Sequence, residues 1–291
     1  MKRTLLIIVV SALIAGNMNV FSQDLKVEVY DKVNIPKKKP IPYPEVREAD
    51  VMWAKIIWRM IDLREKMNLS IYYPLEDIAN RKSFIKCIYS GIKDEGLTAY
   101  TPDDDNNEFI KPFASGPEGM ALIDANLGKE AKTIKVVNDS TGIEEEKNVE
   151  VGVQFDQVKQ LLVKEKWFFD KQHSTMQVRI IGICPIRIFY KLDDKGNPTE
   201  DLTKKKTFWI YYPDARPLLA RHEIYNRHND AQHISYDDFF MQRRFSSYIF
   251  QESNAYNNRP ILSYTLGINS LYEAERIKQY LFEFEHDLWE Y

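Results

Sequence analysis

The clearest strand signal in this chain is the stretch MQVRIIGICPIRIFY at residues 176–190. Apolar and β-branched residues dominate it, with Arg179 and Arg187 as the interruptions, which is typical of a β-strand. Pro185 has no N–H to donate, so it predicts a bulge or a sheet edge at that point. A turn containing Gly-Asn-Pro should then lead to a partner strand at residues 207–212.

A second pair of strands is predicted from another turn sequence. Asn-Asp-Ser-Thr-Gly at residues 138–142 separates two short strand-like segments, 133–137 and 148–151, and favours a hairpin between them. The whole region 97–151 has the pattern of short strands and turns. If the domain divides, we expect the sub-boundary near residue 150.

Helical spacing of apolar residues recurs in five segments. The first is 48–68, where Trp53, Ile56, Met60, Leu63 and Met67 recur at three- and four-residue intervals. The second is 75–93, which ends near Gly96. The third and fourth are 154–166 and 235–253, the latter beginning at Ser235. The last helix begins with a Ser270–Glu273 capping box and has the apolar stripe Ile277, Leu281, Phe284 and Leu288. Helices and strands are grouped rather than alternating, which predicts an α+β fold with an antiparallel sheet in a single domain over residues 47–291.

The N-terminus predicts an exported protein. Residues 1–22 combine Lys2 and Arg3, an apolar stretch too short to cross a bilayer, and a small-residue cleavage site before Gln23, which is the arrangement of a signal peptide. No cysteine lies beside that site, so a lipidated N-terminus is not expected. Loss of Lys2 and Arg3 takes the formal net charge from −3 to −5. An acidic chain is a poor candidate for general nucleic-acid binding, and no later segment predicts membrane insertion.

A proline-rich arm follows the predicted signal. Residues 23–46 carry four prolines around three lysines, which excludes a helix and favours a polyproline-like conformation. Two interpretations stay open: a disordered leader, or an arm that docks on a neighbouring subunit. Under the second, the candidate docking residues are Ile35, Pro36, Pro40, Pro42, Tyr43 and Pro44.

The two cysteines, Cys87 and Cys184, both lie among isoleucines. We interpret them as buried free thiols, although they could pair in an oxidising compartment.

Catalytic and metal-binding motifs are incomplete. His222-Glu223 begins like a zinc-protease motif, but Asn226 stands where the second histidine is needed. Asp103 and its neighbours begin like a calcium loop, yet Glu108 replaces the required glycine. The segment 193–197 fails similarly, because it contains a lysine. The sequence therefore predicts no catalytic residue, no cofactor and no metal ligand, and favours an interaction protein.

Several long, aromatic-rich runs resemble one known family. The run WFFDKQHSTM at residues 167–176, continued by residues 178–183, resembles the central segment of the GldN/PorN family of the type IX secretion system. The same likeness extends to residues 58–59 and 61–66, to YYP at 72–74, to FWIYYP at 208–213 and to EHDLW at 285–289. It runs in order over nearly all of the mature chain. The family often carries arginine where His173 stands.

This resemblance implies a non-enzymatic structural subunit of a periplasmic ring beneath the outer membrane of Bacteroidota. It implies assembly in many copies with the GldK/PorK lipoprotein and a link to the inner-membrane motor formed by GldL and GldM/PorM. Without a lipid of its own, the chain would depend on the lipoprotein to stay at the outer membrane. The resemblance implies no enzymatic activity and no cofactor.

Two other functions stay open on the residues alone. One is a periplasmic hydrolase with a composite site made by His222, Glu223 and the acidic loop. The other is a periplasmic adaptor for exported cargo.

Overall fold

The computed structural model describes residues 34–78, 81–102, 109–137, 144–192, 198–226, 228–229 and 231–288. Internal contacts divide the chain into a unit Met1–Lys32 and a unit Val33–Tyr291, and only the second contains described residues. The predicted signal peptide, the acidic loop at 103–108 and the turn residues 138–142 and 193–197 lie outside the described residues.

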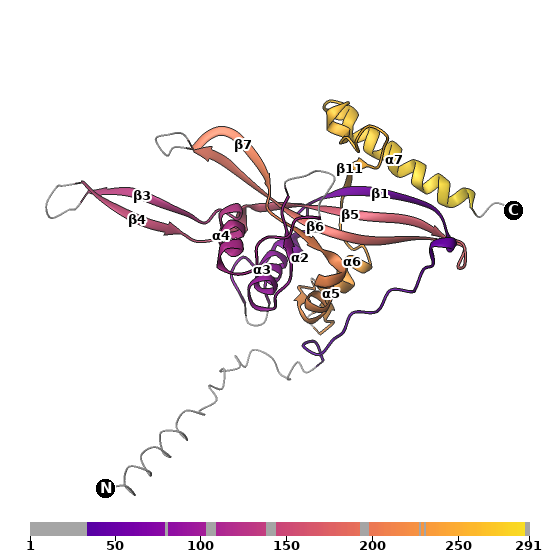
Figure 1. The fold of residues 1–291 in the computed structure, drawn as a ribbon, viewed down its shortest axis with the longest axis horizontal. Helices are drawn as coiled ribbons and strands as arrows, with labels where there is room; N and C mark the ends of the chain where they lie inside the picture. The colour runs from indigo at the N-terminus through magenta and orange to yellow at the C-terminus, as the bar shows by residue number, and fades with distance from the viewer. Residues whose placement is uncertain are drawn as a thin grey trace, which may run out of the picture. The chain divides into compact units, whose positions relative to one another are not determined.

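A seven-stranded antiparallel sheet is the framework of the domain (Figure 1). Six strands follow in the order β11–β1–β5–β6–β8–β2, and β7 pairs with β6 beside this path. Their bounds are β1 Val51–Asp62, β2 Ala99–Tyr100, β5 Val158–Asp170, β6 Thr175–Leu192, β7 Pro198–Lys206, β8 Trp209–Tyr211 and β11 Tyr248–Glu252. The helices lie in separate stretches of the chain, so the predicted α+β class with an antiparallel sheet is confirmed.

The strand predicted at 176–190 is β6, which forms a long hairpin with β5. On its other side β6 changes partner: it pairs with β8 through Gly182 and Ile183, and with β7 from Ile186 onward. Pro185 lies between the two partners, where no ladder bond requires its missing N–H. Its carbonyl instead accepts hydrogen bonds from the backbone N–H (3.0 Å) and the hydroxyl (2.9 Å) of Thr207. Pro185 therefore marks a change of partner strand rather than a bulge.

Two smaller sheets complete the strands. The predicted hairpin is confirmed as β3 Glu130–Val137 paired with β4 Glu144–Val151, with Thr133 opposite Asn148. The other is formed by β9 Glu223–Ile224 and β10 Ile234–Ser235.

The α-helices are α2 Leu69–Tyr72, α3 Phe84–Asp94, α4 Pro117–Asn126, α5 Tyr212–Arg221, α6 Tyr236–Met241 and α7 Ile268–Asp287, with 3-10 turns η1 Glu48–Asp50, η2 Phe155–Gln157 and η3 Ile261–Ser263. The predicted helices at 75–93 and 235–253 are shorter in the structure, and α2, α4 and α5 are helices that the sequence did not predict; α4 lies in the region predicted to hold only short strands and turns. α3 starts at the cap Ser83, later than the predicted residue 75, and Gly96 follows its end with φ +73°, as expected for a helix stop. α7 starts after Gly267 and has no side-chain cap, so the Ser270–Glu273 capping box is wrong.

Two predicted helices are strands. The segment 48–68 contains η1 and β1, and 154–166 contains η2 and most of β5. Both strands are covered on both faces, so successive residues are buried; in β1 this holds from Ile57 to Ile61. A continuous apolar run satisfies helical spacing as well as strand spacing, and periodicity cannot separate them.

The predicted helix at 235–253 is half right. Ser235 caps α6 with a capping box that includes Asp238. The helix ends at Met241, because Arg243 adopts a positive φ of 53° that an α-helix cannot contain. The remainder of the segment includes the edge strand β11.

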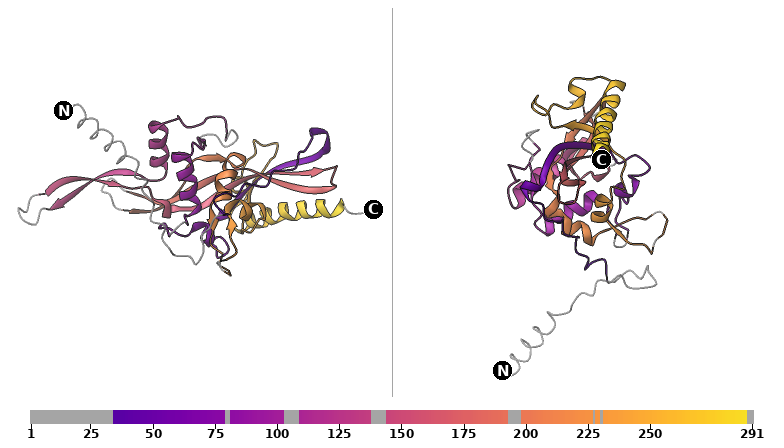
Figure 2. Two further views of the ribbon diagram at one scale, coloured as in Figure 1. Left: turned by 90° about the horizontal axis from the view of Figure 1, so that it is seen from below. Right: turned by 90° about the vertical axis from the view of Figure 1, so that its right-hand side faces the viewer.

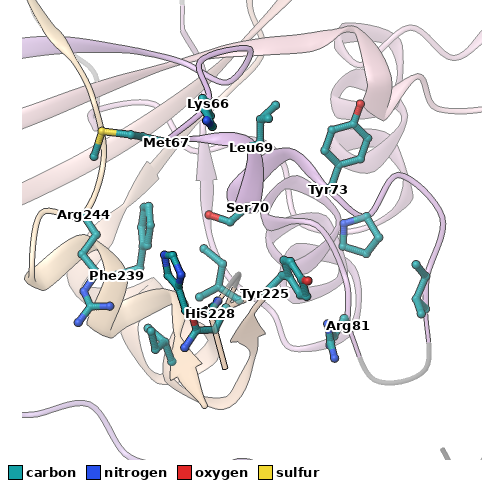
Figure 3. Close-up of a pocket in the computed structure, with 15 residues that line it drawn as sticks. Lys66, Met67, Leu69, Ser70, Tyr73, Arg81, Tyr225, His228, Phe239 and Arg244 are labelled. Carbon is teal, nitrogen blue, oxygen red and sulfur yellow. Dashed lines mark hydrogen bonds between the residues drawn. The ribbon is translucent and has the colours of Figure 1, made fainter. Parts of the chain in front are cut away.

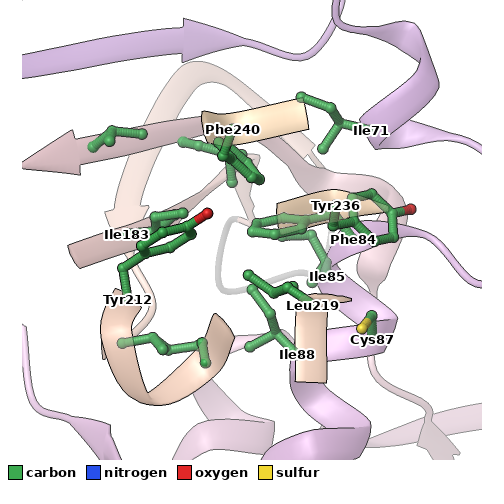
Figure 4. Packing of buried hydrophobic residues seen from close by; sticks show 14 of the residues in the cluster. Ile71, Phe84, Ile85, Cys87, Ile88, Ile183, Tyr212, Leu219, Tyr236 and Phe240 are labelled. Carbon is green, nitrogen blue, oxygen red and sulfur yellow. The ribbon is translucent and has the colours of Figure 1, made fainter. Parts of the chain in front are cut away.

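The main core fills the space between one face of the sheet and α3, α5 and α6. Phe84, Tyr212, Tyr236 and Phe240 are fully buried there and converge (Figure 4). Tyr236 satisfies its hydroxyl by donating to the carbonyl of Lys82 (2.8 Å). Burial of one such ring stabilises a fold by about 1.5–3 kcal/mol, so this cluster holds the three helices on the sheet.

α7 packs over the β11–β1 side of the sheet (Figure 1 and Figure 2). Ile277 and Leu281 are buried, and Phe284 stacks on Trp53 with ring centres 4.6 Å apart. These three members of the predicted stripe are confirmed on the inner face. The fourth, Leu288, is 41 % exposed and is not part of it.

Cys87 and Cys184 are buried free thiols, as predicted. Burial raises the pKa of Cys87 to about 12. Within the described ranges, no helix is both long and apolar enough to cross a membrane.

Candidate functional site

The proline-rich arm lies on its own domain over residues 34–46. Two arginines hold it by its backbone: Arg216 donates to the carbonyl of Ile41 (2.6 Å), and Arg179 donates to the carbonyl of Pro44 (2.5 Å). A polyproline-like segment has no internal hydrogen bonds, so its carbonyls are free to accept from side chains.

A third contact attaches the start of the arm to α6. Lys38 forms an ion pair with Asp238, which also closes the capping box with Ser235. Burial by itself would raise the pKa of Asp238, but the hydrogen bonds from Lys38 and Ser235 outweigh it and the pKa is lowered. The carboxylate therefore links the arm to the start of the helix in its charged form.

Tyr43 is the anchor of the arm. Its ring lies between two guanidinium groups, 4.2 Å from Arg216 and 4.9 Å from Arg179, and lines a cavity of about 420 Å³. Each cation–π contact contributes roughly 0.5–1 kcal/mol. Burial raises the pKa of Tyr43, and its hydroxyl is buried without a hydrogen-bond partner among the described residues.

The arm rests on a rigid group in the helical layer. Arg216, on α5, is 5 % exposed and makes two hydrogen bonds to Asp237 (2.9 and 3.1 Å). Tyr212 donates its hydroxyl to the same carboxylate (2.9 Å). A paired, hydrogen-bonded arginine keeps its orientation, so Arg216 presents a fixed guanidinium face to Tyr43.

The candidate docking residues divide between two faces of the arm. Tyr43 points to the domain, and Ile35 and Pro40 are half-buried. Pro36, Pro42 and Pro44 are exposed, and so is Ile41 at 71 %, which the sequence did not single out.

The His222 region has the contacts of a structural cluster. Glu223 is 8 % exposed and binds His233 (2.8 Å), and Arg81 lies 3.8 Å from it. Burial, followed by the positive charge of Lys82, lowers the pKa of His222. Among the residues that the structure describes, no group of three or more His, Cys, Asp or Glu side chains could hold a metal ion.

A larger hollow opens beside this cluster, with a volume of about 590 Å³. Its walls come from α2, the segment after α2, β9, β10 and the end of α6, and Figure 3 shows Phe239 and Arg244 on one side with Tyr73 and Arg81 on the other. Met67 and Ile78 line it and are 60 % and 63 % exposed. We call this hollow the basic cavity, because its charged lining residues are Lys66, Arg81 and Arg244.

The sequence does not predict the basic cavity. Its walls come from distant segments, and the signal of an apolar face was absent because α2 is one turn long. Tyr73 and Pro74, which line the cavity, belong to the YYP run of the family resemblance.

The chain is thus an α+β domain with an extended arm packed on it and an apolar hollow with cationic walls. The family model described as gliding motility associated protein GldN matches residues 46–290, so the chain belongs to the GldN family. The family is a component of the gliding motility and type IX secretion machinery and is a structural rather than an enzyme family. A comparison with curated proteins gave no significant match.

Proposed function

We propose that this chain is a non-enzymatic structural subunit of a periplasmic ring of the type IX secretion system, associated with the outer membrane. The observation that supports the proposal is the GldN family match over residues 46–290. In this proposal the ring contains many copies of the chain and a GldK/PorK-type lipoprotein, and a GldM/PorM-type motor reaches it from the inner membrane.

The predicted signal peptide supports the periplasmic location. It carries no cysteine for lipid attachment, so position at the outer membrane would come from the lipidated partner. The mature protein and its lipoprotein partner, purified separately and mixed, should sediment together as a very large complex. A monodisperse monomer that ignores the lipoprotein contradicts the proposal.

The arm is the proposed docking element for a neighbouring subunit. Arg179, Arg216 and Asp238 hold its inner face, and its outer face presents Pro42 and Pro44 in a fixed extended conformation. Ordering a segment before binding lowers the entropy cost of association. The arm lies before residue 46, so it falls outside the family match and its role rests on this chain's own contacts.

Deletion of residues 24–44 tests this role. The domain should stay folded, because the main core contains no arm residue, whereas assembly with the lipoprotein should be impaired. Normal complexes from the truncated chain would show that the arm is only a leader.

The hydrolase alternative has a direct test. His222→Ala and Glu223→Ala should abolish secretion if these residues are catalytic. Because Glu223 is held by His233 and Arg81, we expect its replacement to lower stability, and His222→Ala to leave secretion unchanged. Loss of secretion with a stable His222→Ala protein would contradict a purely structural subunit.

A further inference from the structure

The basic cavity has the features of a binding site for an acidic, amphipathic segment. Lys66 and Arg244 line it, and neither forms an ion pair with another residue in the described ranges. Met67 and Tyr73 line the same cavity, are 60 % and 50 % exposed and offer apolar surface. None of the described residues that line the cavity is Asp or Glu. An apolar hollow of about 590 Å³ with unpaired cations is complementary to apolar side chains flanked by carboxylates.

The outer face of α7 has that complementary composition. Its inner face packs against β11 and β1. On the outer side, Leu271, Tyr272 and Phe282 are 58–70 % exposed. Glu283 follows Phe282 directly and Glu285 lies two residues further on, and both are exposed.

The acids near the end of α7 are costly to the helix itself. Glu283, Glu285 and Asp287 lie in its last turns, where the negative end of the helix dipole disfavours carboxylates. Arg276 and Lys278 pair with acids nearer the start of the helix, Glu273 and Glu275. Among the described residues no cation pairs with the three terminal acids. Glu283 accepts a hydrogen bond from Gln279 at 3.0 Å, but no described cation offsets the unfavourable position of these carboxylates.

We propose that the outer face of α7 in one copy of this chain occupies the basic cavity of the next copy. Phe282 enters between Met67 and Tyr73, and the acids beside it face Lys66 and Arg244. This inference rests on the proposed function, because it supplies a contact between repeated subunits.

The two surfaces are different parts of the chain, so the contact is heterologous. One copy that donates α7 still has an empty cavity, and the copy that receives it still has a free α7. Contacts of this kind continue from copy to copy and close as a ring when the rotation permits. A closed two-fold dimer forms only if both α7–cavity contacts are made at once between the same two copies, whereas a chain or ring forms when the geometry permits one contact per pair.

Cross-linking between two single-cysteine variants tests the contact. Met67→Cys and Gln279→Cys place exposed thiols on the cavity and on the outer face of α7, whereas the natural Cys87 and Cys184 are buried. With a short thiol-specific cross-linker, a mixture of the two full-length mature variants should give at least tenfold more cross-linked dimer than either variant alone. Equal yields in the mixture and in the single variants overturn the proposal.

Charge reversal distinguishes this contact from non-specific association. Lys66→Glu with Arg244→Glu in the cavity variant should lower the cross-link yield at least tenfold. Glu283→Lys with Glu285→Lys in the α7 variant should do the same, and mixing both reversed proteins should restore it. Lys204→Glu, an exposed reversal on β7, is the matched control and should leave the yield unchanged. Failure of the double reversal to restore cross-linking, with all variants folded by circular dichroism, overturns the proposal.

The same proteins distinguish this inference from the proposed function. Binding of the lipoprotein without cross-linking between copies rejects the contact and leaves the structural role intact. Cross-linking without lipoprotein binding supports the contact and rejects the lipoprotein as partner. Protection of the Met67→Cys thiol by the lipoprotein, and not by a second copy, assigns the cavity to the lipoprotein and overturns the inference.

Discussion

The guanidinium of Arg216 lies 4.2 Å from the centre of the Tyr43 ring, and the same side chain is hydrogen-bonded to the buried Asp237 at 2.9 and 3.1 Å. The arm is thus attached to the helical layer through a group that is itself immobilised. The strength of this attachment can be measured by changing one residue at a time.

Replacing the Tyr43 ring should release the arm. Tyr43→Ala removes two cation–π contacts and the half-buried ring, at a cost of about 2–3 kcal/mol, and the arm should become sensitive to limited proteolysis while the domain resists. Tyr43→Phe is the matched control, because it removes a buried hydroxyl that has no partner among the described residues. We expect it to be neutral or stabilising by up to about 1 kcal/mol. A loss of stability in Tyr43→Phe as large as in Tyr43→Ala would show that the hydroxyl is bonded.

Attachment of the start of the arm should weaken in acid. The folded pKa of Asp238 lies below the ordinary value of 3.8. Its link to Lys38 therefore contributes fully above that value and is lost as the pH falls through the folded pKa. The carboxylate stays charged from about pH 8 to about pH 5. Protection of residues 34–40 from proteolysis should therefore be constant over this range. It should then fall at more acidic pH. Lys38→Met should weaken proteolytic protection at neutral pH and abolish its further loss in acid. An unchanged loss of protection in acid in this variant would assign the titration to another group.

The buried ion pair between β1 and β5 should be costly to break. Glu165 is fully buried and binds Arg59 at 3.1 Å and Arg243 at 2.9 Å. Burial lowers the pKa of Arg59, and Glu165 opposes this effect. Glu165→Ala leaves two cations without their partner, so the free energy of unfolding should fall by about 3–5 kcal/mol. Chemical denaturation measures the change. The control, Glu275→Ala at an exposed position, should lower the free energy of unfolding by less than about 1 kcal/mol. Similar losses in the two variants would contradict the structural importance of burial here.

Gly182 on β6 should not tolerate a side chain. A Cβ there would lie 2.3 Å from the ring of Phe109 and 2.8 Å from the carbonyl of Ile210. Gly182→Ala should therefore destabilise the protein by roughly 1–3 kcal/mol, as measured by thermal unfolding. Gly152→Ala is the matched control, because a Cβ at Gly152 meets nothing within 4 Å. Equal melting temperatures for the two variants would show that Phe109 moves aside freely.

Local sequence determined those elements whose signals do not depend on distant residues. The strand at 176–190, the hairpin of β3 and β4 and the stop at Gly96 follow from side-chain branching, turn chemistry and backbone freedom, all of which act within a few residues. The inner face of α7 was predictable for a related reason: one of its sides faces solvent, so its apolar residues keep a helical period.

Only the tertiary structure decided the nature of β1 and β5. Both are buried on two faces, and their apolar runs lose the alternation that would mark them as strands. The sequence likewise showed an arm rich in proline but not the arginines that hold it, because Arg179 and Arg216 lie far along the chain. The basic cavity has the same origin: α2, β9 and α6 contribute to it from separate segments, and their proximity depends on the packing of the whole core.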